Sequence, residues 1–197
     1  MELEKILPDN GPAINEVKKY ISKYTDELIV IKCGGSVLLD KNLFNQFIED
    51  ISIINKLGLN SIVVHGGGKK IKKKLDEQNI ESKFIDGLRI TDSKIIEIVE
   101  ETLTELNSEI IEKLEFCNCK AQSITTKKNN IFTVVPERKE LGYVGNPKKI
   151  NKEILLQIIK KKEVPIIIPM GSDENQIPYN INADIAAGAV AKALNSR

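Results

Sequence analysis

The hydrophobic positions of the chain predict short strands that alternate with helices. Apolar and mostly β-branched runs at residues 28–32, 61–65 and 164–169 are typical of buried strands. Between and after these runs, helices are expected at residues 42–57, 68–78, 93–114, 151–162 and 183–194. This alternation predicts an α/β fold with a mainly parallel central sheet between helices.

Local signals refine the predicted helices. In the helix at 42–57, an apolar stripe is expected to face the core, and it consists of Leu43, Phe47, Ile51 and Ile54. Gly58 is expected to end this helix. Thr91 or Asp92 is the expected N-cap of the helix at 93–114.

Two further segments add to this plan. Residues 124–135 and 141–150 have a strand-like pattern with turn residues, which suggests a hairpin. Residues 1–25 form an extension with a short helix at 13–24, and the main domain is expected over residues 26–197. Because the extension lies outside the predicted sheet, its helix is available to pack on a neighbouring molecule.

Composition excludes several classes of function. The formal net charge is +1 and no apolar run approaches the roughly 20 residues that span a bilayer, so we expect neither nucleic acid nor a membrane as a partner. Three cysteines without a secretory signal point to a reducing cytoplasm. Cys117 and Cys119 lack a second ligand pair, and His65 is the only histidine, so no metal site is expected.

A cluster of lysines follows the second predicted strand, at positions 69, 70, 72, 73 and 74. Such a run predicts a solvated helix face. A face that attracts polyanions such as nucleotides is the alternative.

Glycine turns follow two of the predicted strands, and they are the first candidate site. Lys32, Gly34 and Gly35 come at the end of one strand, and Gly67 and Gly68 come after the other. Ligands bind at this edge of an open α/β sheet, where glycine lets backbone N–H groups approach a phosphate. The N-terminus of the following helix adds partial positive charge, and a lysine adds a full one. Neither turn fits a Walker or dinucleotide-binding pattern.

Polar residues in two other segments are candidates for binding an acceptor. Arg89 is either a surface residue that pairs with Asp92 or a bidentate clamp for a carboxylate. Asn180, Asn182 and Asp184 stand at the start of an Ala-rich helix, where capping is the simpler explanation. Because that helix is mostly apolar, its start is expected to lie against the core, where buried polar groups need partners.

Together these segments resemble the amino-acid kinase family, and most of all its members that phosphorylate N-acetyl-L-glutamate. The matching stretches are IVIKCGGS, IVVHGGGKKI, DGLRITD, LGYVGNPKKIN and YNINADIAAGA, and they cover the chain from about residue 28 to residue 194. The resemblance implies a three-layer αβα sandwich like that of carbamate kinase. DGLRITD is the most discriminating stretch, although enzymes that act on carrier-bound aminoadipate share much of it.

The resemblance also implies a role for each candidate residue. Lys32 would neutralise the transferring γ-phosphoryl of ATP, and Asp184 would orient catalytic lysines. Gly34, Gly35, Gly67 and Gly68 would surround the phosphate. Arg89, Asn180 and Asn182 would bind the acceptor, N-acetyl-L-glutamate, together with Gly67 and Gly68. Mg²⁺ would enter with ATP, and the reaction would belong to arginine biosynthesis.

Departures from the family pattern leave further questions open. In the family a nucleotide-binding half follows the Ala-rich helix, so the 197 residues alone are expected to be inactive. The stretch QSITTKKNNIFTV lacks a glycine-containing turn that the family usually has, which leaves the acceptor open. The helix at 13–24 resembles one that links dimers into hexamers in arginine-inhibited members, so a homo-oligomer and inhibition by arginine are expected. The alternatives are a non-catalytic binding or regulatory module, and a kinase for a related acceptor such as carrier-bound aminoadipate.

Overall fold

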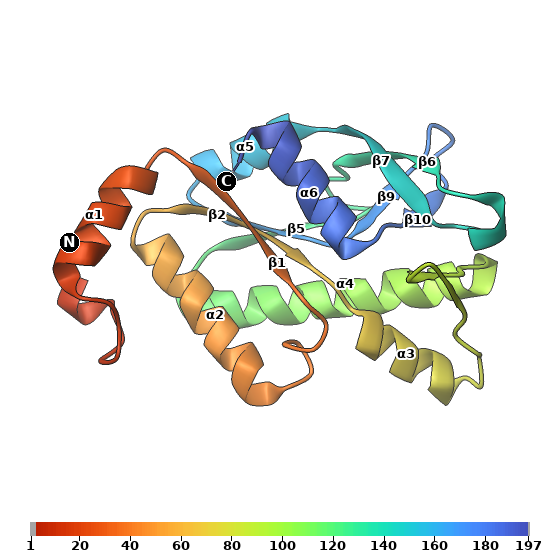
Figure 1. Cartoon of the computed structure of the whole chain (residues 1–197), viewed down its shortest axis with the longest axis horizontal. Coiled ribbons are helices and arrows are strands. Elements are labelled where there is room, and N and C mark those ends of the chain that lie inside the picture. The colour runs from red at the N-terminus through yellow and green to blue at the C-terminus, as the bar shows by residue number, and fades with distance from the viewer. Residues whose placement is uncertain (1–2, 197) are drawn as a thin grey trace.

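The computed structural model describes residues 3–196, and its centre is a parallel sheet between layers of helices (Figure 1). Four strands form the sheet in the order β1-β2-β8-β5, and every neighbouring pair is parallel. The strands are β1 (Leu28–Cys33), β2 (Asn60–His65), β5 (Ala121–Ile124) and β8 (Val164–Ile167). The predicted fold class is therefore confirmed. The strand at β5 was not predicted, because Gln122 and Ser123 interrupt its apolar pattern.

Helices cover both faces of this sheet. One layer contains α2 (Lys41–Lys56), α3 (Gly68–Glu77) and α4 (Ser93–Phe116), and the other contains α5 (Lys152–Lys160) and α6 (Ala183–Leu194) (Figure 1). One apolar cluster fills the space between β2, β8, α2 and α4, and a second lies between the sheet and the layer of α5 and α6. The parallel strands are thus buried on both faces, which explains their continuous apolar sequences.

The ends of α2 and α4 follow the capping rules. Asp40 caps α2 by accepting hydrogen bonds from the backbone N–H groups of Asn42 (2.9 Å) and Leu43 (3.0 Å). Asp92, not Thr91, caps α4 in the same way. After α2, Gly58 has a φ of +80°, which glycine adopts without strain.

The predicted apolar stripe of α2 was partly wrong. Phe44, Ile48 and Ile51 are the buried apolar residues, whereas Leu43 is 47% exposed. Both candidate stripes contain Ile51 and both have helical spacing, so the sequence left the rotation of the helix about its axis undecided. Packing of Phe44 and Ile48 in the cluster that includes α4 selects the face that is observed.

A second sheet extends the domain beside the first. It has the order β10-β9-β6-β7 and contains β6 (Phe132–Pro136), β7 (Gly145–Ile150), β9 (Met170–Ser172) and β10 (Pro178–Asn180). The antiparallel pairing of β6 with β7 confirms the predicted hairpin, although its first strand begins at Phe132 and not at residue 124. Strands β9 and β10 were predicted as loop, because they are only three residues long and contain glycine, proline and polar residues.

Smaller elements complete the chain. The short 3-10 helices are η1 (Leu3–Lys5) and η2 (Lys139–Leu141), and β3 (Phe84–Ile85) pairs with β4 (Leu88–Arg89). Helix α1 (Ile14–Tyr24) lies at the edge of the molecule, outside the sheet (Figure 1). Within residues 3–196, no helix is both long enough and apolar enough to cross a membrane.

Candidate functional site

A cavity of about 220 Å³ opens where β1 and β2 end. It is lined by both glycine turns, by the β3–β4 hairpin and by the segment that leads from β10 into α6. All the predicted site residues except Gly34 line this cavity, namely Lys32, Gly35, Gly67, Gly68, Arg89, Asn180, Asn182 and Asp184. The fold therefore brings four separate sequence segments to one place. Gly34 lies close to the Lys32 side chain, since a Cβ on Gly34 would be 3.8 Å from the Lys32 ammonium.

The glycine turns lie against each other. The backbone N–H of Gly66 donates to the carbonyl of Cys33 (2.8 Å), and a Cβ on Gly35 would lie 3.3 Å from the backbone nitrogen of Gly68. Gly67 is the N-cap residue of α3, so the turn places the N-terminus of this helix in the cavity. Backbone N–H groups and a helix N-terminus together form a site suited to an anion.

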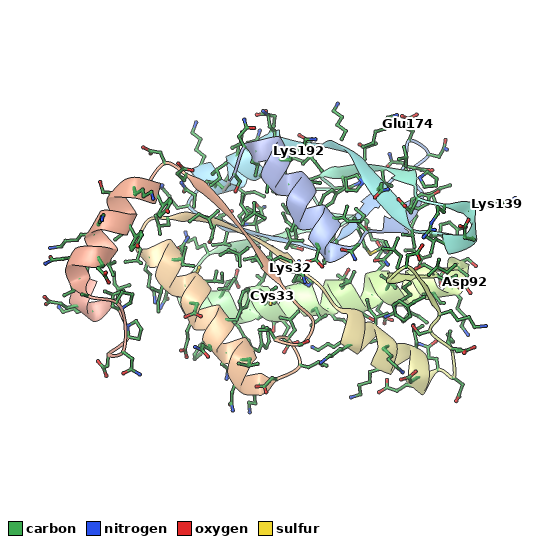
Figure 2. All side chains as sticks on the ribbon, in the orientation of Figure 1. Lys32, Cys33, Asp92, Lys139, Glu174 and Lys192 are labelled. Atoms are coloured by element: carbon green, nitrogen blue, oxygen red, sulfur yellow. The ribbon has the colours of Figure 1, made fainter. Side chains whose placement is uncertain are left out.

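A cationic side chain lies beside these turns. Lys32 lies near the end of β1 (Figure 2). Its ammonium is 3.0 Å from the carboxylate of Asp184 in the first turn of α6. Asn182 caps α6, because its Oδ1 accepts from the N–H groups of Asp184 (2.8 Å) and Ile185 (3.2 Å). The amide nitrogen of the Asn182 side chain is not used in this cap and is the part that a ligand can engage.

The start of α6 was expected against the core, and for Asp184 this was wrong. The Asp184 side chain is 72% exposed. Helix α6 buries one face through Ala186, Ala187 and Val190, while Ile185 on another face is 42% exposed. The apolar composition of α6 therefore did not show which of its polar residues would be buried, because a helix with small side chains has no strong amphipathic pattern.

Arg89 is buried at the floor of the cavity, with 8% of its surface exposed. Its Nη2 donates to the carbonyl of Gly68 (3.2 Å), and its guanidinium carbon lies 4.7 Å from the centre of the Phe84 ring. Nη1 is buried and has no hydrogen-bond partner among the described residues. The predicted surface pairing with Asp92 is not found, since the Asp92 side chain caps α4.

The charge of Arg89 is only weakly compensated by the protein. Burial lowers the pKa of Arg89, and the carboxylate of Asp76 opposes this effect. A guanidinium stays protonated in proteins even so. A buried cation with an unpaired donor is unfavourable unless an anion binds to it, so this arrangement favours an acidic ligand in the cavity.

The lysine-rich face of α3 is paired with carboxylates. Lys70 and Glu109 are 2.7 Å apart, Lys74 and Glu105 are 2.8 Å apart, and Lys72 pairs with Asp76 one turn further along α3. This neutralisation favours the predicted solvated helix face over a nucleotide-attracting one.

Two features of the site were not predicted from the sequence. One is Phe84, whose ring stacks on Arg89 and lines the cavity. The other is the burial of His65 at the end of β2, where it contacts Asn107 of α4 (3.2 Å). The first depends on the pairing of β3 with β4, which places Phe84 opposite Arg89, and the second depends on a contact between distant segments. An aromatic residue near Arg89 and a histidine beside the glycines were visible in the sequence only as isolated signals.

Comparisons with known proteins identify the family to which this chain belongs. Residues 27–197 match the model of the Amino acid kinase family. The chain therefore belongs to this family. Within it, the relatives with high identity are acetylglutamate kinases. The enzyme of Pelagibacter ubique (strain HTCC1062) is 57% identical over 196 residues, which cover 100% of this chain and 68% of the relative. That of Petrotoga mobilis is 39% identical, over 92% of this chain and 62% of the relative.

The chain thus spans about two thirds of the length of these relatives. Among solved structures, smu.665 from Streptococcus mutans UA159 superposes with a TM-score of 0.79 and 29% identity, over 85% of this chain and 69% of that one. Carbamate kinase from Giardia lamblia bound to AMP-PNP has a TM-score of 0.60 and 16% identity, over 86% of this chain and 68% of that one. The second likeness concerns the fold alone. The predicted family and its kinase-like fold are confirmed.

Proposed function

We propose that the full-length protein transfers the γ-phosphoryl group of ATP to the side-chain carboxylate of N-acetyl-L-glutamate, a step of arginine biosynthesis. Two kinds of support exist. The relatives with high identity are named acetylglutamate kinases. The cavity holds groups suited to a phosphate beside a group suited to a carboxylate.

The unpaired Nη1 of buried Arg89 is the observation that carries this proposal. A planar guanidinium binds a carboxylate through parallel hydrogen bonds, and Phe84 stacked on it favours one orientation of that plane. Arg89 also donates to the carbonyl of Gly68, so the acceptor would bind directly beside the glycine turns. This juxtaposition brings acceptor and phosphate together, which is the main requirement for transfer.

The other residues of the cavity would act through their charges or their hydrogen-bond donors. Lys32 would neutralise negative charge on the transferring phosphoryl group, with the N–H groups of Gly35 and Gly67 as further donors. Asp184, 3.0 Å from Lys32, would hold this ammonium in position. Asn180 and Asn182 would donate to the acceptor. Since a glutamate side chain is ionised at neutral pH (pKa about 4.3), its attack on phosphorus needs no general base.

Magnesium would enter as a complex with ATP. Mg²⁺ keeps several waters and is held mostly by phosphates in such sites. Within the described residues, no group of three or more His, Cys, Asp and Glu side chains is placed to bind a metal. In this proposal, the complex of Mg²⁺ with ATP is the substrate.

The experiment that tests this function measures ATP-dependent phosphorylation of N-acetyl-L-glutamate by the full-length protein, beside unacetylated glutamate. Arg89→Ala is expected to raise the KM for the acceptor by about 10- to 100-fold, the effect of losing hydrogen bonds between charged groups. Arg138→Ala is the matched control, because Arg138 forms an ion pair with Asp86 (3.0 Å) and does not line the cavity. A folded protein that turns over no acceptor, or an Arg89→Ala variant with an unchanged KM, would refute the proposal.

The same assay separates the other candidate functions. A non-catalytic binding module would bind the acceptor without turnover. A kinase for carrier-bound aminoadipate would be active only with that acceptor. Both stay predictions, because no feature of the cavity favours either one.

We also propose that the protein forms oligomers through α1 and that arginine inhibits it. Its proposed location is the cytoplasm. Helix α1 packs on the domain through Val17, which contacts a small cluster that includes Leu3 and Leu57, while Tyr20 is 53% exposed. An exposed aromatic residue on this helix suits a contact with another copy. Gel filtration of the full-length protein, with and without residues 1–25, measures the oligomeric state, and a monomer or a dimer in both samples would refute oligomerisation through α1.

A further inference from the structure

A buried polar network lies directly behind the second glycine turn. His65 ends β2 and Asn107 lies in α4, and both side chains are fully buried. The Asn107 amide nitrogen is 3.2 Å from Nε2 of His65 and 2.9 Å from the carbonyl of Ile166 in β8. The hydroxyl of Ser123 in β5 donates to Oδ1 of Asn107 (2.7 Å). This network connects the glycine turn to one helix and two strands.

The partners of His65 determine which nitrogen carries its proton. Nδ1 lies 3.3 Å from the carbonyl of Gly66, which can only accept, so Nδ1 must be the donor. The Asn107 amide is oriented by Ile166 and Ser123, and it therefore presents an N–H to Nε2. Nε2 accepts that bond, so the ring is neutral with its proton on Nδ1. Burial lowers the pKa of His65 to about 4, which agrees with a neutral ring.

The carbonyl that His65 holds belongs to the same peptide unit as the N–H of Gly67. A peptide unit is planar and trans, so its carbonyl and its N–H point in opposite directions. Because the Gly66 carbonyl is held toward the buried ring, the Gly67 N–H must point away from that ring, and both glycines line the cavity. Glycine on both sides of this peptide makes its rotation otherwise inexpensive.

We propose that His65, as the Nδ1–H tautomer held by Asn107, is a positioning residue that fixes the Gly66–Gly67 peptide with its N–H directed at the transferring phosphate. This inference rests on the proposed function for the identity of the anion. His65 touches neither substrate, because its ring is completely buried. It acts only through the orientation of one backbone donor, which a glycine turn by itself does not determine.

The orientation can be tested in the wild-type protein without ligands. Nitrogen-15 NMR of the His65 ring distinguishes the nitrogen that carries the proton from the one that does not. We expect a neutral ring with the proton on Nδ1 at neutral pH. A proton on Nε2 would overturn the proposal, because that tautomer has no donor for the Gly66 carbonyl. This result does not depend on whether the protein is a kinase.

Two substitutions separate positioning from a general contribution to stability. In His65→Asn the side-chain amide nitrogen occupies the place of Nδ1 and keeps a donor for the Gly66 carbonyl. In His65→Gln the amide reaches the place of Nε2, near Asn107, and has no donor at the position of Nδ1. Both variants disturb the packing of the network. Ser52→Ala is the control, because it removes the hydrogen bond of a buried side chain to the carbonyl of Cys117 (3.4 Å), which lies outside the network.

The readout is the affinity of the full-length protein for a non-hydrolysable ATP analogue with Mg²⁺, measured by calorimetry. His65→Gln is expected to bind about fivefold more weakly than His65→Asn, the effect of one neutral hydrogen bond. The carbonyl-carbon shift of Gly66 and the amide-nitrogen shift of Gly67 should move further in His65→Gln than in His65→Asn. Ser52→Ala should bind like the wild type.

Equal affinities and equal shifts in the two His65 variants would overturn the positioning role. If the wild-type protein does not bind the analogue, the proposed function fails instead. The shifts of Gly66 and Gly67 and the tautomer then still decide whether His65 orients the peptide. If both variants fail to fold, a ring proton on Nε2 in the wild type would still overturn the proposal.

Discussion

Lys32 and Asp184 form an ion pair with a separation of 3.0 Å, although they come from the first strand and the last helix of the chain. The pair is 35% exposed on the lysine side and 72% exposed on the aspartate side. An exposed pair contributes little to stability, about 0–1 kcal/mol. The pair is therefore important for the site because both residues line the cavity, and not because of its contribution to stability.

Asp184→Asn should reduce turnover with little effect on folding. The substitution keeps the shape of the side chain but removes the charge that holds the Lys32 ammonium, so we expect kcat of the full-length enzyme to fall about tenfold or more. The melting temperature should change by no more than a few degrees. Glu174→Gln is the control, because it breaks a similarly exposed pair with Lys148 on β7 (3.1 Å), and Glu174 lies apart from Lys32 (Figure 2). An equal loss of kcat in both variants would contradict this role.

Gly67→Ala should destabilise the fold, whereas Gly68→Ala should not. A Cβ on Gly67 would lie 2.7 Å from Leu103 and 3.1 Å from Leu106, both of which are almost fully buried in α4. Overpacking of this kind typically lowers the free energy of unfolding by about 1–3 kcal/mol. A Cβ on Gly68 would meet none of the described residues within 4 Å. Denaturant unfolding of the two variants measures the difference, and equal stabilities would show that α4 yields to the added methyl group.

Gly142→Ala should be more harmful than Gly58→Ala, although both residues have a positive φ. The φ values are +65° and +80°, so alanine is strained by about 1–3 kcal/mol at either site. At Gly142 the added Cβ would also clash with the carbonyl oxygen of Thr91, while at Gly58 it would meet no atom of residues 3–196 within 4 Å. Thr91 follows Arg89 closely, so Gly142→Ala should also weaken acceptor binding. Calorimetry and thermal unfolding of both variants test this, and an unchanged affinity would show that the strain does not reach Arg89.

The stability of the protein should fall in mildly acidic solution because of His65. An unfolded chain protonates this residue near pH 6.5, whereas in the folded chain desolvation by burial, and to a lesser degree the charge of Lys70, lowers the pKa to about 4. Between these values the unfolded state binds more protons, so the free energy of unfolding decreases as the pH falls. The expected loss is about 2 kcal/mol between about pH 7 and about pH 5.

His65→Asn removes the titrating group and is the comparison for this pH dependence. The difference in free energy of unfolding between the wild type and His65→Asn should shrink as the pH falls from about 7 to about 5. Urea unfolding at several pH values measures it. Parallel curves for the two proteins would show that His65 is already accessible to protons in the folded state.

Much of the fold follows from local patterns in the sequence. The strands at residues 28–32 and 61–65 and the helix at 93–114 were predicted within two residues of β1, β2 and α4, because long apolar runs and caps are local signals. The two glycine turns that line the cavity were also identified, since glycine at the ends of parallel strands has a physical consequence that does not depend on distant residues.

Only the tertiary structure decided how these parts meet. The sequence could not select the buried face of α2, because Leu43 and Phe44 both begin a stripe with helical spacing. It could not show that Arg89 is buried with one unpaired nitrogen, that Asp184 is exposed beside Lys32, or that His65 bonds with Asn107. Each of these properties depends on contacts between segments far apart in the chain. Periodicity and residue type determine where helices and strands form. Packing between distant segments determines which side chains are buried and which groups they contact.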